Sequence, residues 1–493
     1  MVSTRTRGGG PLVSRRRWLA VAAVALAGLA LRLWILRTPQ GALNADESFT
    51  GLQAMEIVHG DLPVIFEGQA YTAVPESYVF APFVAIFGAH VVALKLLTGL
   101  WWAVAAFLVH RLLRPIVGTW AALLGAALVW IAPGTTMVMS LRAYEGYGSG
   151  VVAVLLAALA VQRAVRADGP SVRSSAVAGF AVGLAFYVHP MFLAVVLPMM
   201  LVPSVAHRRS VKRWWLPAGI GVLVANVPFL LWNAANDWDS LNQPTSGTDS
   251  PLVRLGHFFT ELAPRAMGLR DFDGHWTLGA AGPIVAIVVL GLIVVGAVTL
   301  WRRGRVERVL VAPLVLAWPI MSLFGNLDYV ADGRYGVIVF PFVVIGVAAG
   351  TSKVVRRIDR PSSVIIATIV WAALLVVPWA STNLGDVVND PNADVQAVVD
   401  VLDQAAITRV AGNFWWVLPI EYQSDRRVRG EVVGNPYVVR LPESHEIVEA
   451  ADDTDVAFVF DASDDDVSRL RMPIHEYERR EIGRAVLYVP LTA

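Results

Sequence analysis

Apolar runs of about 18 to 22 residues recur from the N-terminal region to residue 381, and they limit the fold more than any other feature of the chain. A helix of about 20 residues crosses the ~30 Å hydrocarbon core of a bilayer, so each run is long enough to span it. Only 16% of the residues are charged, against roughly 25% in soluble domains. The sequence therefore predicts a polytopic α-helical membrane protein with about eleven transmembrane helices. The expected spans are 18–37, 90–110, 117–134, 147–165, 176–188, 191–206, 214–234, 280–301, 309–325, 335–352 and 362–381.

Arginine clusters fall in every second loop between these spans. Loops rich in Arg and Lys stay on the cytoplasmic side of membrane proteins, so we expect a cytoplasmic N-terminus and, with an odd number of spans, a C-terminus outside. Lysine is scarce beside arginine, which is typical of a GC-rich bacterial genome. The expected location is a bacterial plasma membrane. The clusters are Arg15–Arg17; Arg111 and Arg114; Arg163, Arg166 and Arg173; Arg208, Arg209, Lys212 and Arg213; Arg302, Arg303, Arg305 and Arg308; and Lys353, Arg356, Arg357 and Arg360.

The chain changes character after residue 381, because the remaining segment has 21 acidic and 10 basic residues. We expect two domains, a transmembrane module over 1–381 and a small soluble extracytoplasmic domain over 382–493. Helical and β-like stretches alternate in the second, which favours an α/β domain with a partly parallel sheet. The expected helices are Asp394–Ala406, Ser444–Ala451 and Asp464–Arg471, and the expected strands are Arg409–Asn413, Val428–Val433, Asp455–Asp461 and Arg484–Val489.

The first outer loop, residues 38–89, contains six carboxylates and opens with the signals of a helix. Asn44 is a good N-cap, Glu47 follows three residues later as in a capping box, and Gly60 is a good C-terminal stop. We expect this helix to lie at the membrane surface, with its apolar side down and its polar side exposed to a cavity. The polar side would carry Asp46, Thr50 and Gln53, and the apolar side Phe49, Leu52 and Met55.

Asp46 and Glu47 place two carboxylates next to each other at the membrane face. A hydroxyl acceptor must lose its proton as it attacks an activated carbon, and a positioned carboxylate can take that proton. The alternative is that both residues only complement the positive end of the helix, an effect worth about 0.3–1 kcal/mol each. The two residues by themselves leave both interpretations open.

Short motifs continue along the loop: Gly60-Asp-Leu-Pro63, Gly68-Gln-Ala-Tyr71, Pro75-Glu-Ser-Tyr78, Ala81-Pro82, Phe87-Gly88 and Ala93-Leu-Lys95. Together with Asp46-Glu47, this series resembles the first periplasmic loop of the C-type glycosyltransferase superfamily. Bacterial members include the aminoarabinose and protein O-mannosyl transferases. Ala73 stands where that loop usually has a glycine. Weaker likenesses are Pro228-Phe-Leu-Leu-Trp-Asn233, Asp332-Gly-Arg-Tyr335 and Phe414-Trp-Trp416.

The resemblance implies a reaction in which a sugar passes from a polyprenyl-phosphate donor to a cell-envelope glycan, lipid or protein acceptor on the outer face. Asp46 matches the catalytic aspartate of the motif and would act as general base. Glu47 would orient the acceptor or assist a bound cation. The implied partners are the sugar donor, the acceptor and the lipid bilayer, and they include no nucleic acid.

A lipid-phosphate leaving group needs positive charge close to the outer membrane face. The candidates for binding the donor phosphate are Arg334, Arg142 and Lys95. Each can equally be an interfacial cation that reaches lipid head groups.

Tyr71, Glu76, Tyr78, Asn233 and Tyr335 are the candidates for contacts with sugar or acceptor hydroxyls. Aromatic residues also populate membrane interfaces without any such role. The resemblance makes no cofactor certain.

A divalent cation is a candidate cofactor, and Glu56 with His59 is the weak candidate pair of ligands. A lone histidine is more often part of polar packing, and no tight His/Asp spacing supports a metal site.

Two other classes of function compete with the enzyme. A transporter or lipid flippase would explain many spans and proline-broken helices, but it predicts ionisable residues at span centres and related repeat halves. An inactive scaffold would not need the adjacent carboxylates.

Overall fold

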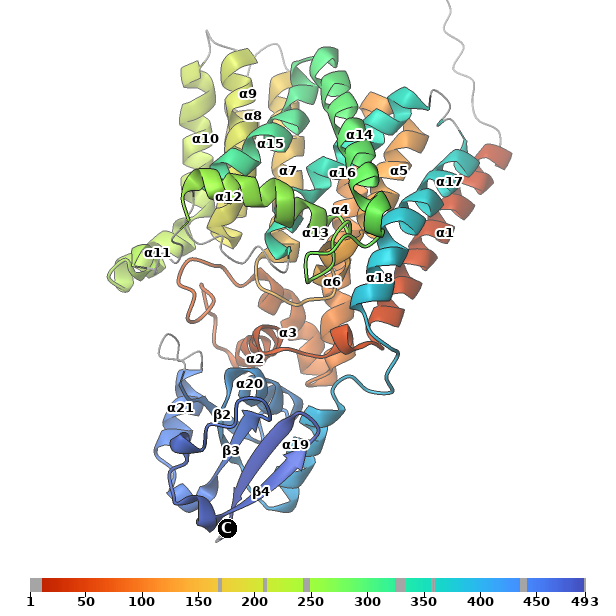
Figure 1. The fold of residues 1–493 in the computed structure, drawn as a ribbon. Coiled ribbons are helices and arrows are strands. Elements are labelled where there is room, and N and C mark those ends of the chain that lie inside the picture. Colours follow the sequence, from red (N-terminus) through yellow and green to blue (C-terminus); the bar gives the residue numbers. More distant parts are fainter. Residues whose placement is uncertain are drawn as a thin grey trace, which may run out of the picture.

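The computed structural model describes residues 11–166, 171–206, 211–242, 249–323, 333–355, 358, 360–434 and 441–491. Asp332, Arg208, Arg209, Arg356 and Arg357, which were named above, lie outside these residues. Most of the chain is helical, and a small sheet lies at the end of the molecule opposite most of the helical bundle (Figure 1). The helices are α1 Pro11–Ile35, α2 Ala45–His59, α3 Pro75–Phe87, α4 Val91–Val117, α5 Thr119–Trp130, α6 Gly134–Met139, α7 Tyr147–Arg166, α8 Val172–Val188, α9 Leu193–Ala206, α10 Val211–Ala225, α11 Val227–Ala235, α12 Pro251–His257, α13 Ala263–Ala266, α14 Gly282–Arg303, α15 Arg305–Ser322, α16 Phe340–Val354, α17 Pro361–Trp371, α18 Val377–Asn383, α19 Ala393–Gln404, α20 Phe414–Gln423 and α21 Pro442–Glu449.

Every expected span falls on a helix or on a broken pair of helices. Among the described residues, five helices are long and apolar enough to cross a membrane, and α10 and α11 form a sixth candidate with a bend of 58° between them. The fold is therefore mostly helical with several apolar helices, while the count of eleven spans stays a prediction. The five helices are Trp18–Ile35, Val91–Val117, Tyr147–Arg166, Gly279–Arg303 and Pro361–Asn383.

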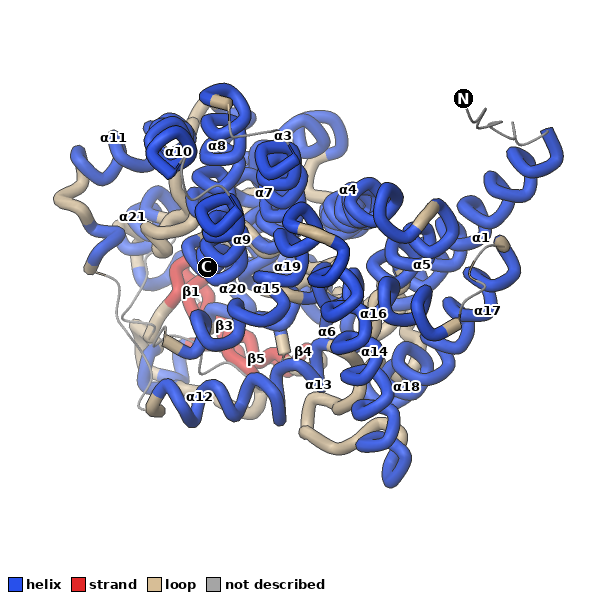
Figure 2. Tube along the Cα trace, turned by 90° about the horizontal axis from the view of Figure 1, so that it is seen from above, coloured by secondary structure: helices blue, strands red, loops and turns tan. Residues whose placement is uncertain are grey.

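Helices from the two ends of the apolar region meet in the bundle. The first helix, α1, lies beside α17 in both views (Figures 1 and 2). The indole of Trp130 on α5 stacks on the buried guanidinium of Arg32 on α1, at 3.8 Å from the ring centroid. These contacts bring the start of the first loop close to the helices that end the apolar region.

The helix expected at the start of the first loop is present, and its N-terminus has the expected cap. Asn44 Oδ1 accepts a hydrogen bond from the Glu47 backbone N–H at 3.0 Å, and Glu47 Oε2 accepts one from the Asn44 N–H at 3.3 Å. Gly60 ends the helix in the left-handed conformation, with φ of 105°. A second helix in this loop, α3, was not expected, because Pro75 looks like a helix breaker although it starts a helix well at its first position.

The expected surroundings of α2 were wrong. Its apolar residues Phe49 and Leu52 pack against Leu418 and Tyr422 of α20, so the helix lies between the bundle and the C-terminal sheet (Figure 1). A Cβ atom at Gly51 would lie 2.3 Å from the Tyr422 ring, which shows how closely the two helices approach. Apolar protein surface therefore covers the face that was expected to meet lipid. The polar face is also covered, because Thr50 and Gln53 are buried.

The C-terminal segment contains a five-stranded mixed sheet in the order β2-β1-β3-β5-β4. β1 pairs in parallel with both β2 and β3, while β5 pairs antiparallel with β3 and β4. Helices α19 and α20 cover one face of the sheet, and α21 packs on the other. The strands are β1 Arg409–Gly412, β2 Arg429–Val432, β3 Val456–Asp461, β4 Tyr477–Ile482 and β5 Ala485–Pro490.

Most elements expected in this segment are present within a few residues, but one expected helix is absent and two elements were not expected. The helix expected over 464–471 is only a short 3-10 turn at Val467–Arg469, because the Asp466 carboxylate bonds Ser468 and Arg469 locally. Helix α20 was missed because Pro419 lies inside it. The edge strand β4 was missed because its sequence is largely charged.

Candidate active site

Glu47 is the most heavily bonded side chain at the start of α2, and it is fully buried. Lys95 Nζ donates to both of its carboxylate oxygens, at 2.7 and 2.8 Å. Arg142 Nη1 donates to Oε2 at 2.8 Å, and the Ala143 backbone N–H donates to Oε1 at 3.1 Å. Burial alone would raise the pKa of Glu47, but Lys95 and Arg142 hold that pKa below its usual value.

This cluster changes the roles expected for two residues. Lys95 is completely buried against Glu47, so it does not face an open site where it could meet a donor phosphate. Glu47 has both oxygens occupied and is not available to orient an acceptor or hold a cation. A buried charge is stable only when it is paired and hydrogen-bonded, which is the physical reason for both placements.

Asp46, the neighbouring residue on the first turn of α2, is partly exposed. Its charge acts on Arg142 and on Tyr144, both in the loop between α6 and α7. Arg142 is held by Glu47, by the Ala42 carbonyl oxygen at 3.0 Å and by Gln40 Oε1 at 3.2 Å. The fixed guanidinium therefore provides positive charge beside the Asp46 carboxylate.

Tyr144 is a member of this site that we did not single out from the sequence. Its hydroxyl accepts a hydrogen bond from Asn44 Nδ2 at 2.5 Å, so it lies against the N-cap of α2. Burial and the nearby carboxylates Asp46 and Glu47 raise the pKa of Tyr144 to about 12, although Arg142 and Arg334 oppose this shift. The sequence feature that could have identified Tyr144 is its position two residues after Arg142 in the same short loop.

Arg334 acts electrostatically on Tyr144, so the structure brings it to the same side of the molecule as Asp46. It begins the short 3-10 helix Arg334–Ile338, and its guanidinium lies 5.7 Å from the centroid of the Tyr335 ring. The preceding Gly333 has φ of 73° and packs closely against Thr135 and Arg265. This tight packing positions the Arg334-Tyr335 pair.

A row of aromatic rings connects Tyr144 with the middle of the first loop. The ring centroids of Tyr144 and Tyr147 are 6.0 Å apart, those of Tyr147 and His189 are 6.3 Å apart, and those of His189 and Tyr71 are 5.5 Å apart. Tyr71 therefore belongs to a continuous row that starts beside Asp46.

Glu76 is buried and holds the loop rather than facing an open site. Its carboxylate accepts hydrogen bonds from the backbone N–H groups of Gly146 and Ser149, at 3.0 and 2.9 Å. Burial and the neighbouring Glu76 raise the pKa of Glu145 well above its usual value, so these two carboxyl groups form a buried pair. The pair fastens the first turn of α3 to the start of α7.

Tyr78 and Asn233 have structural partners away from Asp46. The Tyr78 hydroxyl donates to the Pro63 carbonyl oxygen at 3.1 Å. Asn233 is buried on α11, where Nδ2 donates to the Phe229 carbonyl oxygen and Oδ1 accepts from Ser240 Oγ. The polar groups of both residues thus stabilise the backbone around them.

The candidate metal pair Glu56 and His59 lies on the last turns of α2. His59 Nδ1 lies 2.8 Å from the Met55 carbonyl oxygen, and Glu56 lies 3.6 Å from Arg426 of the C-terminal segment. Burial and the nearby Glu67 raise the pKa of Glu56 to about 7. Neither residue belongs to the group of three or more ligand side chains that could hold a metal ion in the described part of the chain.

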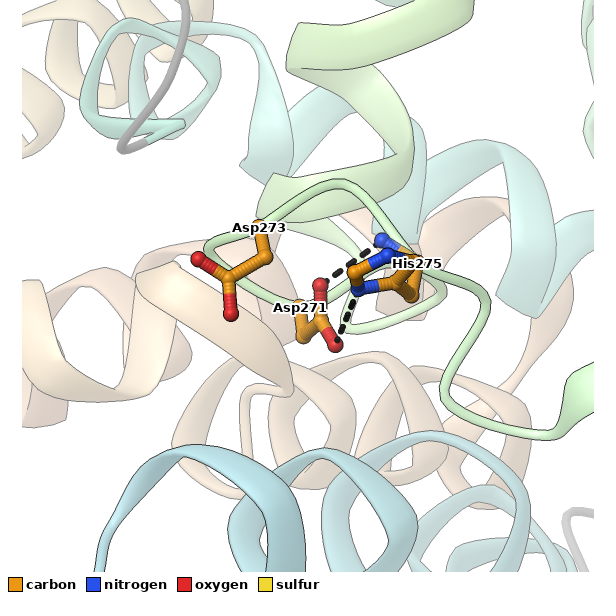
Figure 3. Close-up of side chains that lie close together, drawn as sticks. All are labelled: Asp271, Asp273 and His275. Atoms are coloured by element: carbon orange, nitrogen blue, oxygen red, sulfur yellow. Dashed lines mark hydrogen bonds and ion pairs between the residues drawn. The ribbon is translucent and has the colours of Figure 1, made fainter.

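A different group has that geometry, on the loop between α13 and α14 (Figure 3). Ligand atoms of Asp271, Asp273 and His275 lie within 4.8 Å of one another. The Asp271 carboxylate accepts a hydrogen bond from the His275 backbone N–H at 2.7 Å. This hydrogen bond by itself explains why the three side chains lie close together. The group therefore does not alter the assignment of the candidate site around Asp46.

Comparison with known proteins gives a match to part of the sequence and a match in fold along most of the chain. The family model described as dolichyl-phosphate-mannose-protein mannosyltransferase matches residues 75–232. No curated protein matches the sequence.

Three solved structures show the same fold. ArnT from Cupriavidus metallidurans in the apo state has a TM-score of 0.63 at 11% identity, covering 96% of this chain and 98% of ArnT. ArnT bound to undecaprenyl phosphate has a TM-score of 0.62 at 13% identity, with coverage of 96% and 97%. The apo oligosaccharyltransferase of Archaeoglobus fulgidus has a TM-score of 0.52 at 13% identity, with coverage of 91% and 70%. The chain therefore has the fold of ArnT, and its expected resemblance to the C-type glycosyltransferases that use polyprenyl-phosphate sugars is confirmed.

Proposed function

We propose that this protein is a membrane glycosyltransferase that moves a sugar from a polyprenyl-phosphate donor to a hydroxyl of a cell-envelope acceptor. The observation that carries the proposal is the pairing of a partly exposed Asp46 with a neighbour, Glu47, that is completely neutralised by Lys95 and Arg142. The cluster fixes the first turn of α2, so Asp46 has a defined position and remains the accessible carboxylate of the two.

In the proposed reaction, Asp46 takes the proton from the acceptor hydroxyl while that oxygen forms a bond to the anomeric carbon of the donor. The bond between this carbon and the phosphate oxygen breaks, and the electron pair leaves with the polyprenyl phosphate. Arg334 compensates the negative charge that develops on the phosphate. Tyr71, Tyr147 and Tyr335 offer ring faces and hydroxyls to the sugars.

An apolar groove of about 520 Å³ between α5, α14, α16 and α17 supports a prenyl donor. Its lining includes Leu128, Val289, Val347 and Leu375. The end of the groove at Leu375 lies close to the segment before Arg334. The Leu375 carbonyl oxygen packs against Gly268, and Gly268 packs against Gly134. The loops of these two glycines also pack beside Gly333. A prenyl chain in this groove would reach towards Arg334, and ArnT, which has this fold, has been solved with undecaprenyl phosphate bound.

The distribution of charge supports a site on the outer face. Arg111, Arg114, Arg163 and Arg166 line a pocket of about 350 Å³ at the far ends of α4 and α7. Lys95 and Tyr147, at the near ends of the same helices, lie at the proposed site. Arginine-rich ends remain cytoplasmic, so we place Asp46 and the domain of residues 382–493 outside a bacterial plasma membrane, with the transmembrane module over 1–381.

Transfer of radiolabelled sugar from a panel of polyprenyl-phosphate sugars, measured in membranes, tests the proposal. Asp46→Asn keeps the shape of the side chain but cannot accept the proton, so we expect transfer to fall by at least roughly 100-fold at normal expression. Asp61→Asn makes the same chemical change in the same loop and should retain transfer. Wild-type activity in Asp46→Asn would refute the assignment of the base.

A further inference from the structure

A separate pocket lies at the edge of the C-terminal sheet, away from the residues of the proposed reaction. Its volume is about 280 Å³, close to the lower limit of roughly 300–1,000 Å³ for small-molecule sites. Three segments of chain line it: residues 413–415 after β1, residues 433–434 after β2, and residues between Phe460 and Arg469 at the end of β3 and beyond. The pocket is thus built from the carboxyl ends of all three parallel strands.

The topology of the sheet explains why a pocket forms at this place. The connection from β1 to β2 runs through α20 on one face, and the connection from β2 to β3 runs through α21 on the other. Leu470 and Met472, in the segment after β3, pack on the same face as α21, so the loops that leave β1 and β3 turn to opposite faces and a crevice opens between them. In open α/β sheets, ligands bind in such a crevice, outside the carboxyl ends of the strands.

The lining combines one large aromatic surface with polar groups. The Trp415 side chain is 56% exposed at the start of α20, while the neighbouring Asn413 caps that helix through its side-chain oxygen. Arg469 Nε donates to Asp466 Oδ2 at 2.5 Å, which fixes the guanidinium. Gly434, with φ of 78°, lies directly under it, since a Cβ atom there would be 1.1 Å from Arg469 Nη1.

The charge of the lining argues for a neutral ligand. Asp464 and Asp466 together outnumber the single cation Arg469, so the pocket offers no excess of positive charge to an anion. Carboxylate, amide and guanidinium groups fixed around an exposed ring suit a molecule with many hydroxyls and a flat C–H face. Hydroxyls can both donate to Asp464 and accept from Arg469, and the C–H face can pack on the indole of Trp415.

We propose that this pocket binds a neutral sugar unit of the acceptor glycan. The identity of the ligand as acceptor rests on the proposed function, while the binding of a sugar rests on the pocket itself. Helix α20 links the pocket to α2: it packs on α2, and Phe414, which lines the pocket, packs on the apolar cluster that α20 and α2 share around Ala45 and Phe49. A glycan anchored at Trp415 would be held next to the helix that carries the proposed base.

Binding of fluorescently labelled neutral oligosaccharides, such as arabinan, mannan and galactan fragments, to the full-length protein in nanodiscs tests this inference without any donor. We expect Trp415→Ala to weaken binding at least tenfold. Val467→Ala changes an exposed apolar residue of the loop after β3 that does not line the pocket, and it should bind as the wild type does. Asp464→Ala, which leaves the aromatic surface intact, provides a second pocket variant if Trp415→Ala does not fold.

Three results would overturn the inference: no neutral oligosaccharide binds, the pocket variants bind normally, or inorganic phosphate displaces the glycan more strongly than free sugars do. Asp46→Asn should bind the oligosaccharide with unchanged affinity, because the pocket needs no chemistry. Binding that depends on Trp415 in a protein that transfers no sugar would contradict only the proposed function. If the wild-type protein transfers sugar but Trp415→Ala binds glycan normally, only the inference about the pocket is contradicted.

Discussion

The glutamates at the two ends of α2 have pKa values shifted in opposite directions. At its start, Glu47 has two cations and two backbone N–H groups around it, and its pKa lies below the usual value. At its end, Glu56 shares Arg426 with the carboxylates Glu421 and Glu443, and burial with Glu67 nearby raises its pKa to about 7. The same type of side chain on the same helix thus has a pKa below its usual value at one end and a pKa of about 7 at the other.

This difference shows that one carboxylate, Glu47, fixes the helix, while its neighbour Asp46 is the one that we propose for the reaction. The Glu47 cluster joins α2, α4 and the loop before α7, which fixes the position of the neighbouring Asp46. The Glu56 end joins α2 to the C-terminal segment through one arginine that several carboxylates share. The end of α2 that we propose for catalysis is therefore the end whose buried carboxylate is fully paired.

The largest expected effect comes from breaking the Glu47 cluster. Lys95→Met leaves a buried carboxylate with only part of its positive charge, and removal of one partner from a buried pair costs about 3–5 kcal/mol. The thermal midpoint of unfolding in detergent should fall sharply. The exposed Lys212 provides the matched control, and Lys212→Met should unfold at the wild-type temperature. An unchanged midpoint in Lys95→Met would show that the cluster does not stabilise the fold.

A smaller effect should appear at the other end as a dependence of stability on pH. The folded-state pKa of Glu56, about 7, exceeds its ordinary value of 4.5, so the folded protein binds the proton more tightly than the unfolded chain does. The contribution of Glu56 to the free energy of unfolding is therefore fully present below about pH 4.5. It is lost as the pH rises to about 7, by up to about 3 kcal/mol.

Unfolding of Glu56→Gln, followed between pH 4.5 and 8, measures this contribution. The variant should lose that part of the pH dependence and be more stable than the wild type at pH 8. Glu446→Gln, an exposed change on α21, should keep the wild-type profile. A Glu56→Gln profile parallel to that of the wild type would contradict the raised pKa.

The smallest expected effect on stability concerns Tyr144. Tyr144→Phe removes the hydroxyl that accepts from Asn44 Nδ2, which should cost about 1 kcal/mol of folding free energy. Transfer should fall by roughly tenfold, since the loss of about 1.4 kcal/mol of transition-state positioning has that effect. Tyr187→Phe removes a hydroxyl bonded to the Val64 carbonyl oxygen and should leave transfer unchanged. Equal activity of both variants would remove Tyr144 from the site.

Local patterns were sufficient for much of the fold. The apolar runs located the long helices, because a span is a property of about 20 consecutive residues. The cap at Asn44 and the stop at Gly60 follow from neighbouring residues, and both are present. The strands around Val410 and Val459 were likewise visible as short β-like stretches.

The site followed only in part from the sequence. Asp46 and Glu47 were recognised as a pair, but two adjacent carboxylates look alike in a sequence. Lys95 and Arg142 lie 48 and 95 residues away from Glu47 in the chain, and only the folded protein shows that they neutralise it. Tyr144 and the row from Tyr144 to Tyr71 were missed for the same reason.

The sequence by itself determined a membrane protein with many apolar helices, a capped helix at the start of its first loop, and a resemblance that points to sugar transfer. Only the tertiary structure decided that this helix packs against α20, that Glu47 is an occupied anion beside a more accessible Asp46, and that the parallel strands end in a pocket around Trp415. Helix signals depend on near neighbours in the chain. Burial, ion pairing and pockets depend on residues that only folding brings together.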